Sequence, residues 1–319
     1  MVPVESGVDR GLAWHYGDPL REQRLLEEGT GMVDLANREV VRITGGDRAA
    51  YLNLLGTAKL DSLAPGETAS TLLLDPQGHI IFFLAVVETG EEIWGWTEPG
   101  YGRGVAGHLN RMKFRMDVAA EVREDMSVIW SGTPVDGPCR RGTPNCLGGA
   151  ETFVCCGDVT SLMAGADPVG MWAYTARRIA AGIPRIGTDT DSRTIPNEIG
   201  VPSENLSLNK GCYPGQETVA KVYNVGAPPR RLVRLHLDGS GERFLDSGAP
   251  ITLDGDLIGH VGSMAYHHEL GPIALGMVKR ETDDDSTVLA DGVPARIDPL
   301  VPRDAGLHVR FRNTTLPLK

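Results

Sequence analysis

The chain has 319 residues, of which 41% are apolar and 23% charged, enough to build one large globular domain or two ordinary ones. Its formal net charge of −11 at pH 7 argues against a general nucleic-acid or anionic-membrane binder, because both need a basic surface. No segment has the length and apolarity of a membrane span, and the first ten residues lack a secretory pattern, so we expect a cytoplasmic protein.

The first half of the chain alternates between helical and extended patterns. Asp47 is placed to cap a helix, and Asp75-Pro76-Gln77-Gly78 predicts a turn between two apolar runs. We expect helices over residues 19–28, 48–55, 105–113 and 169–181, and strands over residues 40–44, 70–74, 79–87, 92–97, 115–122 and 126–131. Residues 133–151 are rich in Gly and Pro and are expected to form a loop.

After Pro228-Pro229 the pattern changes to short strands at close spacing. Asp254-Gly255 and Asp291-Gly292 are hairpin turn signals. The expected strands cover residues 232–237, 251–253, 257–265, 273–278, 287–289 and 293–297. This texture predicts a small antiparallel barrel, with a domain boundary that divides the chain into residues 1–230 and 231–319. Asp283-Asp284-Asp285 is interpreted as a solvated loop.

Five cysteines are an odd number, so reduced thiols are expected. Cys155 and Cys156 are adjacent, and Cys139 and Cys146 are seven apart, so neither pair has the spacing of a zinc site. We interpret these four as structural and expect no metal centre.

The pair His267-His268 is interpreted as surface or turn residues, because adjacent residues of a strand face opposite ways.

Gly102-Arg103-Gly104-Val105-Ala106-Gly107 matches the GxGxxG pattern of dinucleotide-binding proteins. The preceding Pro99-Gly100-Tyr101 adds a loop where that fingerprint needs a tight strand-to-helix turn. The surrounding strands also do not repeat as strand–helix–strand units. We therefore expect no nucleotide site here.

The most informative motif is Lys210-Gly211-Cys212-Tyr213-Pro214-Gly215-Gln216-Glu217. A cation near a thiol favours the reactive thiolate, and glycines allow close backbone approach to a ligand. If Lys210 and Cys212 face the same space, the lysine lowers the pKa of the thiol. From residue types alone, a reactive site and a tight turn with a small buried cysteine both remain open.

This motif resembles the signature Lys-Gly-Cys-Tyr-x-Gly-Gln-Glu of the YgfZ family of folate-binding proteins, relatives of the glycine-cleavage aminomethyltransferases. The likeness extends to five other segments: residues 178–184, 195–198, 230–232, 259–263 and 274–276. Residues 228–231 and 15–18 look most like the actinobacterial branch of the family.

The resemblance implies an α+β fold of ferredoxin-like or related subdomains around a central cavity, with a C-terminal antiparallel β-barrel packed on it. It also implies tetrahydrofolate as cofactor and a role in making or maintaining iron–sulfur enzymes, with such client enzymes or assembly factors as partners. Cys212 is then the reactive thiol, assisted by Lys210.

The resemblance also assigns residues to folate binding. Glu198 aligns with the carboxylate that holds the pterin, and a carboxylate suits the amide-like edge of that ring. Arg230 or Arg231 would pair with the anionic glutamate tail. Tyr213 and Tyr223 are candidates for ring contact, and Gln216 is expected to position the loop.

One position departs from the aminomethyltransferase pattern. Where those enzymes place an Asp beside the reacting folate nitrogen, this chain has Phe82, and no carboxylate lies between Gly78 and Val87. One-carbon transfer needs acid–base help at that nitrogen, so the glycine-cleavage reaction is not expected. Three functions are compared: a folate-binding factor for iron–sulfur proteins, a folate-dependent transferase or demethylase, and a folate-binding scaffold whose cysteine is only structural.

Overall fold

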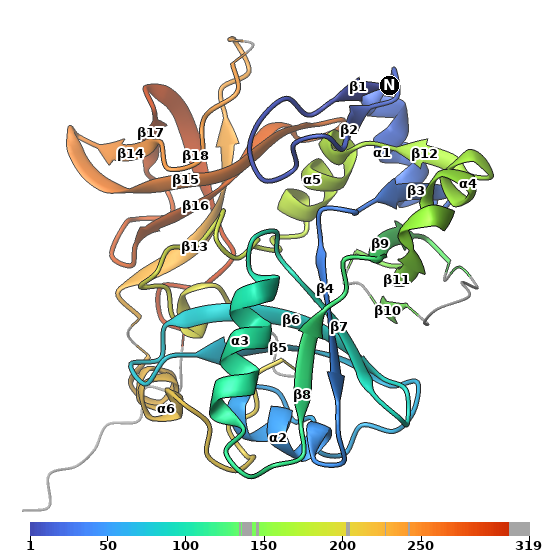
Figure 1. The fold of residues 1–319 in the computed structure, drawn as a ribbon. Helices are drawn as coiled ribbons and strands as arrows, with labels where there is room; N and C mark the ends of the chain where they lie inside the picture. The colour runs from blue at the N-terminus through green and yellow to red at the C-terminus, as the bar shows by residue number, and fades with distance from the viewer. Residues whose placement is uncertain are drawn as a thin grey trace, which may run out of the picture.

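The computed structural model describes residues 1–133, 135, 142–144, 147–201, 205–226, 228–241 and 243–305. These residues form two five-stranded sheets with helices packed on them and a closed six-stranded barrel (Figure 1). Cys139 and Cys146 lie outside the described residues. None of the described helices is long and apolar enough to cross a membrane.

One sheet is built from a contiguous stretch of chain and carries α2 and α3. Its elements are β4 (Glu39–Thr44), α2 (Arg48–Leu55), β5 (Thr68–Leu74), β6 (Ile80–Glu88), β7 (Ile93–Thr97), α3 (Gly102–Met112) and β8 (Ala119–Val122). The strand order is β5-β6-β7-β4-β8. Without β5, this is the order of a ferredoxin-like β-α-β-β-α-β unit, which confirms that expectation for this sheet.

The other sheet draws its strands from both sides of that stretch, in the order β10-β11-β9-β3-β12. Its strands are β3 (Gly31–Asp34), β9 (Met126–Ser131), β10 (Thr143–Pro144), β11 (Ala150–Cys155) and β12 (Asp167–Val169), and its helices are α1 (Pro19–Glu27), α4 (Val159–Ala164) and α5 (Met171–Ala180). β10 and the start of β11 correct the loop predicted over residues 133–151. A hairpin of β1 (Val2–Pro3) and β2 (Ala13–His15) precedes α1.

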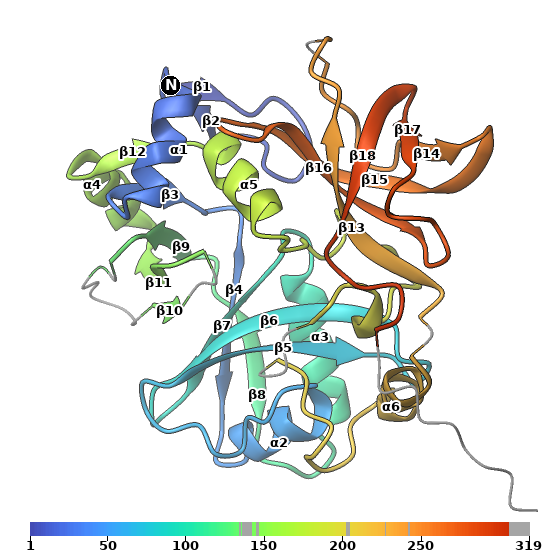
Figure 2. The ribbon, with the colours of Figure 1, turned by 180° about the vertical axis from the view of Figure 1, so that it is seen from behind.

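The barrel closes in the order β13-β16-β15-β14-β17-β18, as the spacing of short strands predicted. Its strands are β13 (Arg230–Leu237), β14 (Pro250–Leu253), β15 (Asp256–His267), β16 (Gly271–Lys279), β17 (Thr287–Ala290) and β18 (Val293–Pro299). Both residues of Asp254-Gly255 and of Asp291-Gly292 have positive φ, the conformation of tight hairpin turns. The long strand β15 packs against α5, which joins the barrel to the first part of the chain (Figure 2).

Charged side chains join three parts of the chain: the segment between β1 and β2, the sheet that contains β4 to β8, and the loop after α5. A single carboxylate oxygen of Glu98 accepts from Arg38 and, at 2.6 Å, from Arg185 Nε. Arg185 Nη1 donates to both oxygens of Asp9 at 2.7 and 2.8 Å. Both arginines are almost fully buried.

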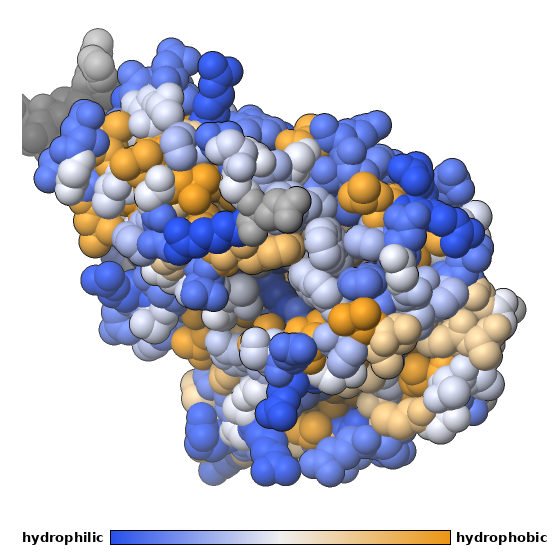
Figure 3. All heavy atoms as spheres, turned by 90° about the horizontal axis from the view of Figure 1, so that it is seen from above, coloured by the Kyte–Doolittle hydropathy of each residue, from blue (hydrophilic) through white to orange (hydrophobic). Residues whose placement is uncertain are grey.

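Seen from above, the molecule is hollowed near the middle of that face, with hydrophilic residues at the bottom of the hollow (Figure 3).

Candidate functional site

The signature loop is anchored to the end of α2 by Lys210. Its ammonium donates to three backbone carbonyls: Asn53 at 2.5 Å, Ala58 at 2.8 Å, and Gly56. The last carbonyls of a helix lack partners within the helix, so a cation is favoured there. Burial lowers the pKa of Lys210 to about 8, and the charge of Asp61 acts in the opposite direction.

These contacts give Lys210 a different role from the one the sequence suggested. Its ammonium is directed into the carbonyl cluster, whereas Cys212 is an exposed, unpaired thiol. Activation of the thiol by the lysine therefore stays a prediction without a contact behind it. Cys212 itself is open to solvent, so the buried-cysteine reading of this turn is wrong.

Tyr213, in contrast to the exposed Cys212, is only 5% exposed. Lys210 Nζ lies 5.1 Å from the centre of its ring. Its hydroxyl has no hydrogen-bond partner among the described residues, and burial raises its pKa to about 12. The loop thus turns the thiol outward and uses Tyr213 as its internal anchor.

Gly215 fits the signature loop onto the β5–β6 turn. Its φ is +77°, in the left-handed region that favours glycine. A Cβ added there would lie 2.6 Å from Cα of Gly78 and 2.7 Å from the carbonyl oxygen of Asp75. The turn itself is held by Asp75, which accepts from the backbone N–H groups of Gln77 and His79. α6 (Gln216–Val225) begins directly after Gly215.

We expect Gly215→Ala to destabilise the protein by about 2–5 kcal/mol, because a left-handed non-glycine residue costs about 1–2 kcal/mol and overpacking about 1–3 kcal/mol. Gly211→Ala is the matched control, since a Cβ at Gly211 would meet nothing within 4 Å. Urea denaturation of both variants measures the difference. Equal stability of the two variants would contradict the interlocked turn.

The second part of the site is a charge cluster at η2 (Pro196–Glu198), where the barrel begins. Arg230 donates to both carboxylate oxygens of Glu198 at 2.9 and 3.0 Å, and to both of Asp191 at 2.6 and 3.1 Å. Glu198 also accepts from the backbone N–H of Ile195 and is fully buried. The guanidinium of Arg230 holds the pKa of Asp191 well below its usual range.

This cluster changes the roles expected for Glu198 and the two arginines. Glu198 and Arg230 are already paired with each other, so neither presents a free charge to a ligand in this structure. Arg231 is fully buried and donates to the carbonyls of Thr282 and Val301 and to Asp284. That placement counts against contact between Arg231 and a folate tail, and it corrects the view of Asp284 as merely solvated.

We expect Asp191→Asn to cost about 1 kcal/mol at pH 7, a modest loss because the carboxylate is about one-third exposed. Since its folded-state pKa is lowered, the contribution is complete above about pH 4 and is lost as the pH falls through the folded pKa. The stability gap between wild type and variant should therefore narrow in acid. Denaturation at pH 7, 4 and 3 tests this, with Asp246→Asn, an exposed carboxylate outside the cluster, as control; a constant gap would contradict it.

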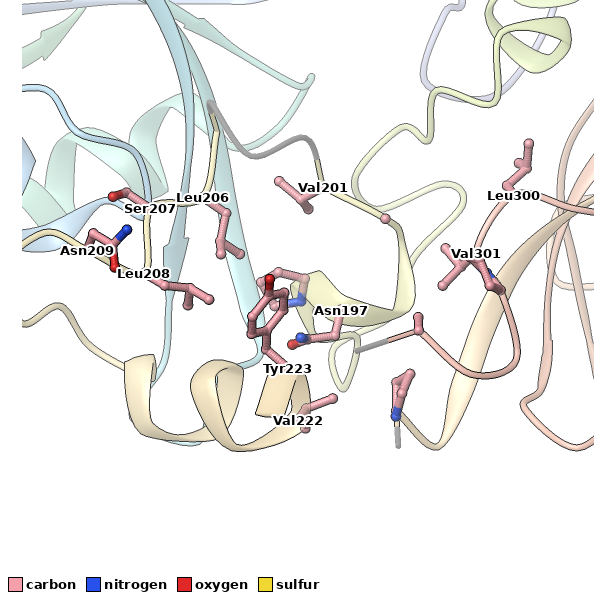
Figure 4. Close-up of a pocket in the computed structure, with 15 residues that line it drawn as sticks. Asn197, Val201, Leu206, Ser207, Leu208, Asn209, Val222, Tyr223, Leu300 and Val301 are labelled. Carbon is pink, nitrogen blue, oxygen red and sulfur yellow. The ribbon is translucent and has the colours of Figure 1, made fainter. Parts of the chain in front are cut away.

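A pocket of about 450 Å³ lies between η2, α6 and the chain that follows the barrel (Figure 4). Its wall is mostly apolar, with the ring of Tyr223 from α6 and the amide of Asn197 from η2 (Figure 4). Ser207 and Asn209 add polar groups on the side of the signature motif. Tyr223 is 40% exposed, so part of its ring is free for a ligand.

Phe82 faces α3 instead of the middle of the molecule. Its ring meets Tyr101 at 6.2 Å and His108 at 5.9 Å, in edge-on and tilted arrangements. The next residue, Phe83, lies on the opposite face of β6 and packs 5.2 Å from Trp96. Neither of these two positions of the strand carries a carboxylate, so the argument against acid–base help from this strand holds for both.

The GxGxxG stretch opens α3, but its surroundings do not suit a dinucleotide. The backbone N–H of Gly102 donates to Glu39 at 2.5 Å, so a carboxylate already occupies this end of the helix. A Cβ at Gly104 would lie 2.9 Å from the Phe82 ring, so this glycine serves packing. The adjoining sheet is antiparallel, unlike the parallel sheet of the nucleotide fold.

The barrel is the part of the chain that matches a known protein family. Residues 230–299 match the glycine cleavage T-protein C-terminal barrel domain. The chain is 26% identical to an aminomethyltransferase of Rippkaea orientalis over 84% of this chain and 83% of that protein. It is 25% identical to a chloroplastic protein of Arabidopsis thaliana named as a transferase, over 80% of this chain and 66% of that protein.

The likeness to T-protein structures extends beyond the barrel. A crystal structure of the glycine cleavage system aminomethyltransferase T from Bartonella henselae superposes with a TM-score of 0.74 at 17% identity, over 94% of each chain. The predicted α+β aminomethyltransferase-like fold is thereby confirmed. Together these matches support a place in the T-protein superfamily; the narrower YgfZ assignment is not among them and stays a prediction.

Sequence reasoning missed three features of the site. Asp191 was not recognised as the second partner of Arg230, although it lies among the polar residues just before Glu198. Asn197 lies in the segment 195–198 and was given no role, yet it lines the pocket. The carbonyls that hold Lys210 carry no sequence signal at all, because every residue has one.

Proposed function

We propose that this protein binds tetrahydrofolate and supports the assembly or repair of iron–sulfur proteins in the cytoplasm, with Cys212 as the reactive thiol. In this proposal the folate-binding part is residues 1–230 and the barrel is residues 231–319. The observation that carries it is the pocket of about 450 Å³ between η2, which contains Glu198, and residues 206–209, which lead into the signature motif.

The pocket has the composition expected of a site for a folate-sized ligand. Such sites are largely apolar and carry a few polar groups that fix orientation, within about 300–1,000 Å³. Tyr223 offers a ring face to the pterin. The Nδ2 of Asn197 donates to the Val219 carbonyl at 3.3 Å, whereas its Oδ1 has no partner among the described residues, so Oδ1 offers an acceptor to the amide-like edge of the pterin. Glu198 and Arg230 then act by holding η2, and with it Asn197, in place.

The alternative is a folate-dependent aminomethyltransferase or demethylase, which the names of the relatives favour. The two functions differ in their need for an acid–base group at the reacting nitrogen, and Phe82 and Phe83 supply none. An assay with the lipoyl carrier protein of the glycine cleavage system and tetrahydrofolate separates them. Measured turnover would favour the transferase.

Tyr223→Ala should weaken tetrahydrofolate binding about 5- to 150-fold, since stacking on an aromatic ring is worth about 1–3 kcal/mol per base by alanine substitution. The control is Tyr16→Ala, which removes a tyrosine of similar exposure (36%) outside the pocket. Isothermal titration calorimetry measures both variants. Equal affinities for the two variants would place the folate elsewhere.

A further inference from the structure

The pair His267-His268 is not arranged as its sequence suggested. β15 ends at His267 and the chain turns, so the two rings stack with centroids 4.8 Å apart instead of facing opposite ways. Glu27, the last residue of α1, reaches the same place, and its Oε1 lies 2.9 Å from Nε2 of His268. One ligand atom from each of the three residues lies within 4.8 Å of the others.

We propose that Glu27, His267 and His268 form a binding site for a divalent first-row transition ion such as Zn²⁺, which joins α1 to the β15–β16 turn of the barrel. Two imidazoles and a carboxylate are a ligand set that zinc uses when a fourth position stays open to water. This inference is independent of the proposed folate function.

The backbone that carries these ligands is fixed before any ion arrives. Gln23, one helical turn before Glu27, is 2% exposed. Its amide donates to the carbonyl of Tyr266 at 3.0 Å and accepts from the backbone N–H of His268 at 2.9 Å. Trp172 Nε1 also donates to the Tyr266 carbonyl at 3.0 Å. Helix and turn are therefore held together by groups that are not themselves ligands, which reduces the ordering cost of binding.

The ligand atoms need only small movements to meet one ion. Zinc binds nitrogen and oxygen at about 2.0–2.2 Å, so tetrahedral ligand atoms lie about 3.4 Å apart. The Glu27 side chain is 39% exposed and free to adjust. Nδ1 of His267 carries a lone pair, because it accepts from the backbone N–H groups of Glu269 and Leu270. At 3.2 and 3.3 Å those bonds are long, so an ion can replace them at small cost.

The test is titration of the metal-stripped full chain with Zn²⁺ alone. Wild type and His267→Ala/His268→Ala are compared by calorimetry and by the shift of the thermal unfolding midpoint. Cysteine thiolates also bind zinc, so the measure is the difference between variants and not the total uptake. We expect the double variant to lose at least about tenfold in affinity at one site, together with most of the midpoint shift.

Two further variants sharpen the result. Glu27→Gln keeps an acceptor for His268 but removes the charge, so it should weaken zinc binding without loosening the turn. His236→Ala is the control: its imidazole is 35% exposed, lies 3.6 Å from a carboxylate of Asp298, and belongs to the barrel outside the proposed site. Zinc binding that is absent in wild type, or equal in wild type and the double variant, would overturn the proposal.

Discussion

Cys212→Ser should abolish the cellular function of the protein while leaving its stability unchanged. The thiol is exposed, so its replacement removes no buried contact. Serine keeps the size and hydrogen-bonding capacity of the side chain but cannot form a thiolate at neutral pH. The measurement is the activity of iron–sulfur enzymes in a deletion strain complemented with wild type or variant.

The control is Cys156→Ser, which changes another exposed cysteine far along the chain from the signature, at the start of η1 (Cys156–Asp158). It should support growth and enzyme activity as wild type does. Purified Cys212→Ser should still bind tetrahydrofolate and unfold at the wild-type midpoint. Full activity in cells carrying only Cys212→Ser would favour the scaffold interpretation, in which the thiol has no chemical role.

Arg230→Ala should produce the largest loss of stability, about 3–5 kcal/mol, because it leaves a buried carboxylate without its partner. Glu198 is fully buried, and Arg230 contributes two of the three hydrogen bonds to its carboxylate. Arg230→Lys should be intermediate, since lysine keeps the charge but loses the planar fork that reaches both carboxylates. The midpoint of urea denaturation is the measurement.

The cost should come from the unpaired charge and not from the lost side chain. Adding Glu198→Gln to Arg230→Ala should therefore recover part of the stability, which a double-mutant cycle measures. Arg193→Ala, at an exposed arginine in the same loop, should stay within about 0.5 kcal/mol of wild type. No recovery in the double variant would mean that packing of the Arg230 stem dominates.

Local signals were enough to predict much of the fold. The Asp-Gly pairs of the barrel need positive φ, and that requirement marks their turns in any context. The turn from Asp75 to Gly78 was predictable for the same reason, because Gly78 also has a positive φ. The strands β3 and β12 were not predicted from the sequence, because each is short and is defined by pairing with a segment far away in the chain. Such pairing has no periodicity within its own segment to detect.

The site was harder to predict than the fold, for a physical reason. The motif identified the residues Lys210, Cys212 and Tyr213, but not which of them is exposed. That depends on the carbonyls at the end of α2, more than 150 positions earlier in the chain. The pairing of Glu198 with Arg230 likewise depends on where the barrel docks. Contacts between distant segments decided each of these roles.

The interleaved order of the two sheets has a consequence for synthesis on the ribosome. Residues 39–122 hold every strand of the ferredoxin-like sheet, so this unit can form as soon as it emerges. β3 is made earlier but must wait for β9 and β12, and Asp9 must wait for Arg185. The N-terminal segment thus leaves the ribosome with its apolar residues uncovered until its later partners are made, which is the state in which a chaperone would bind it.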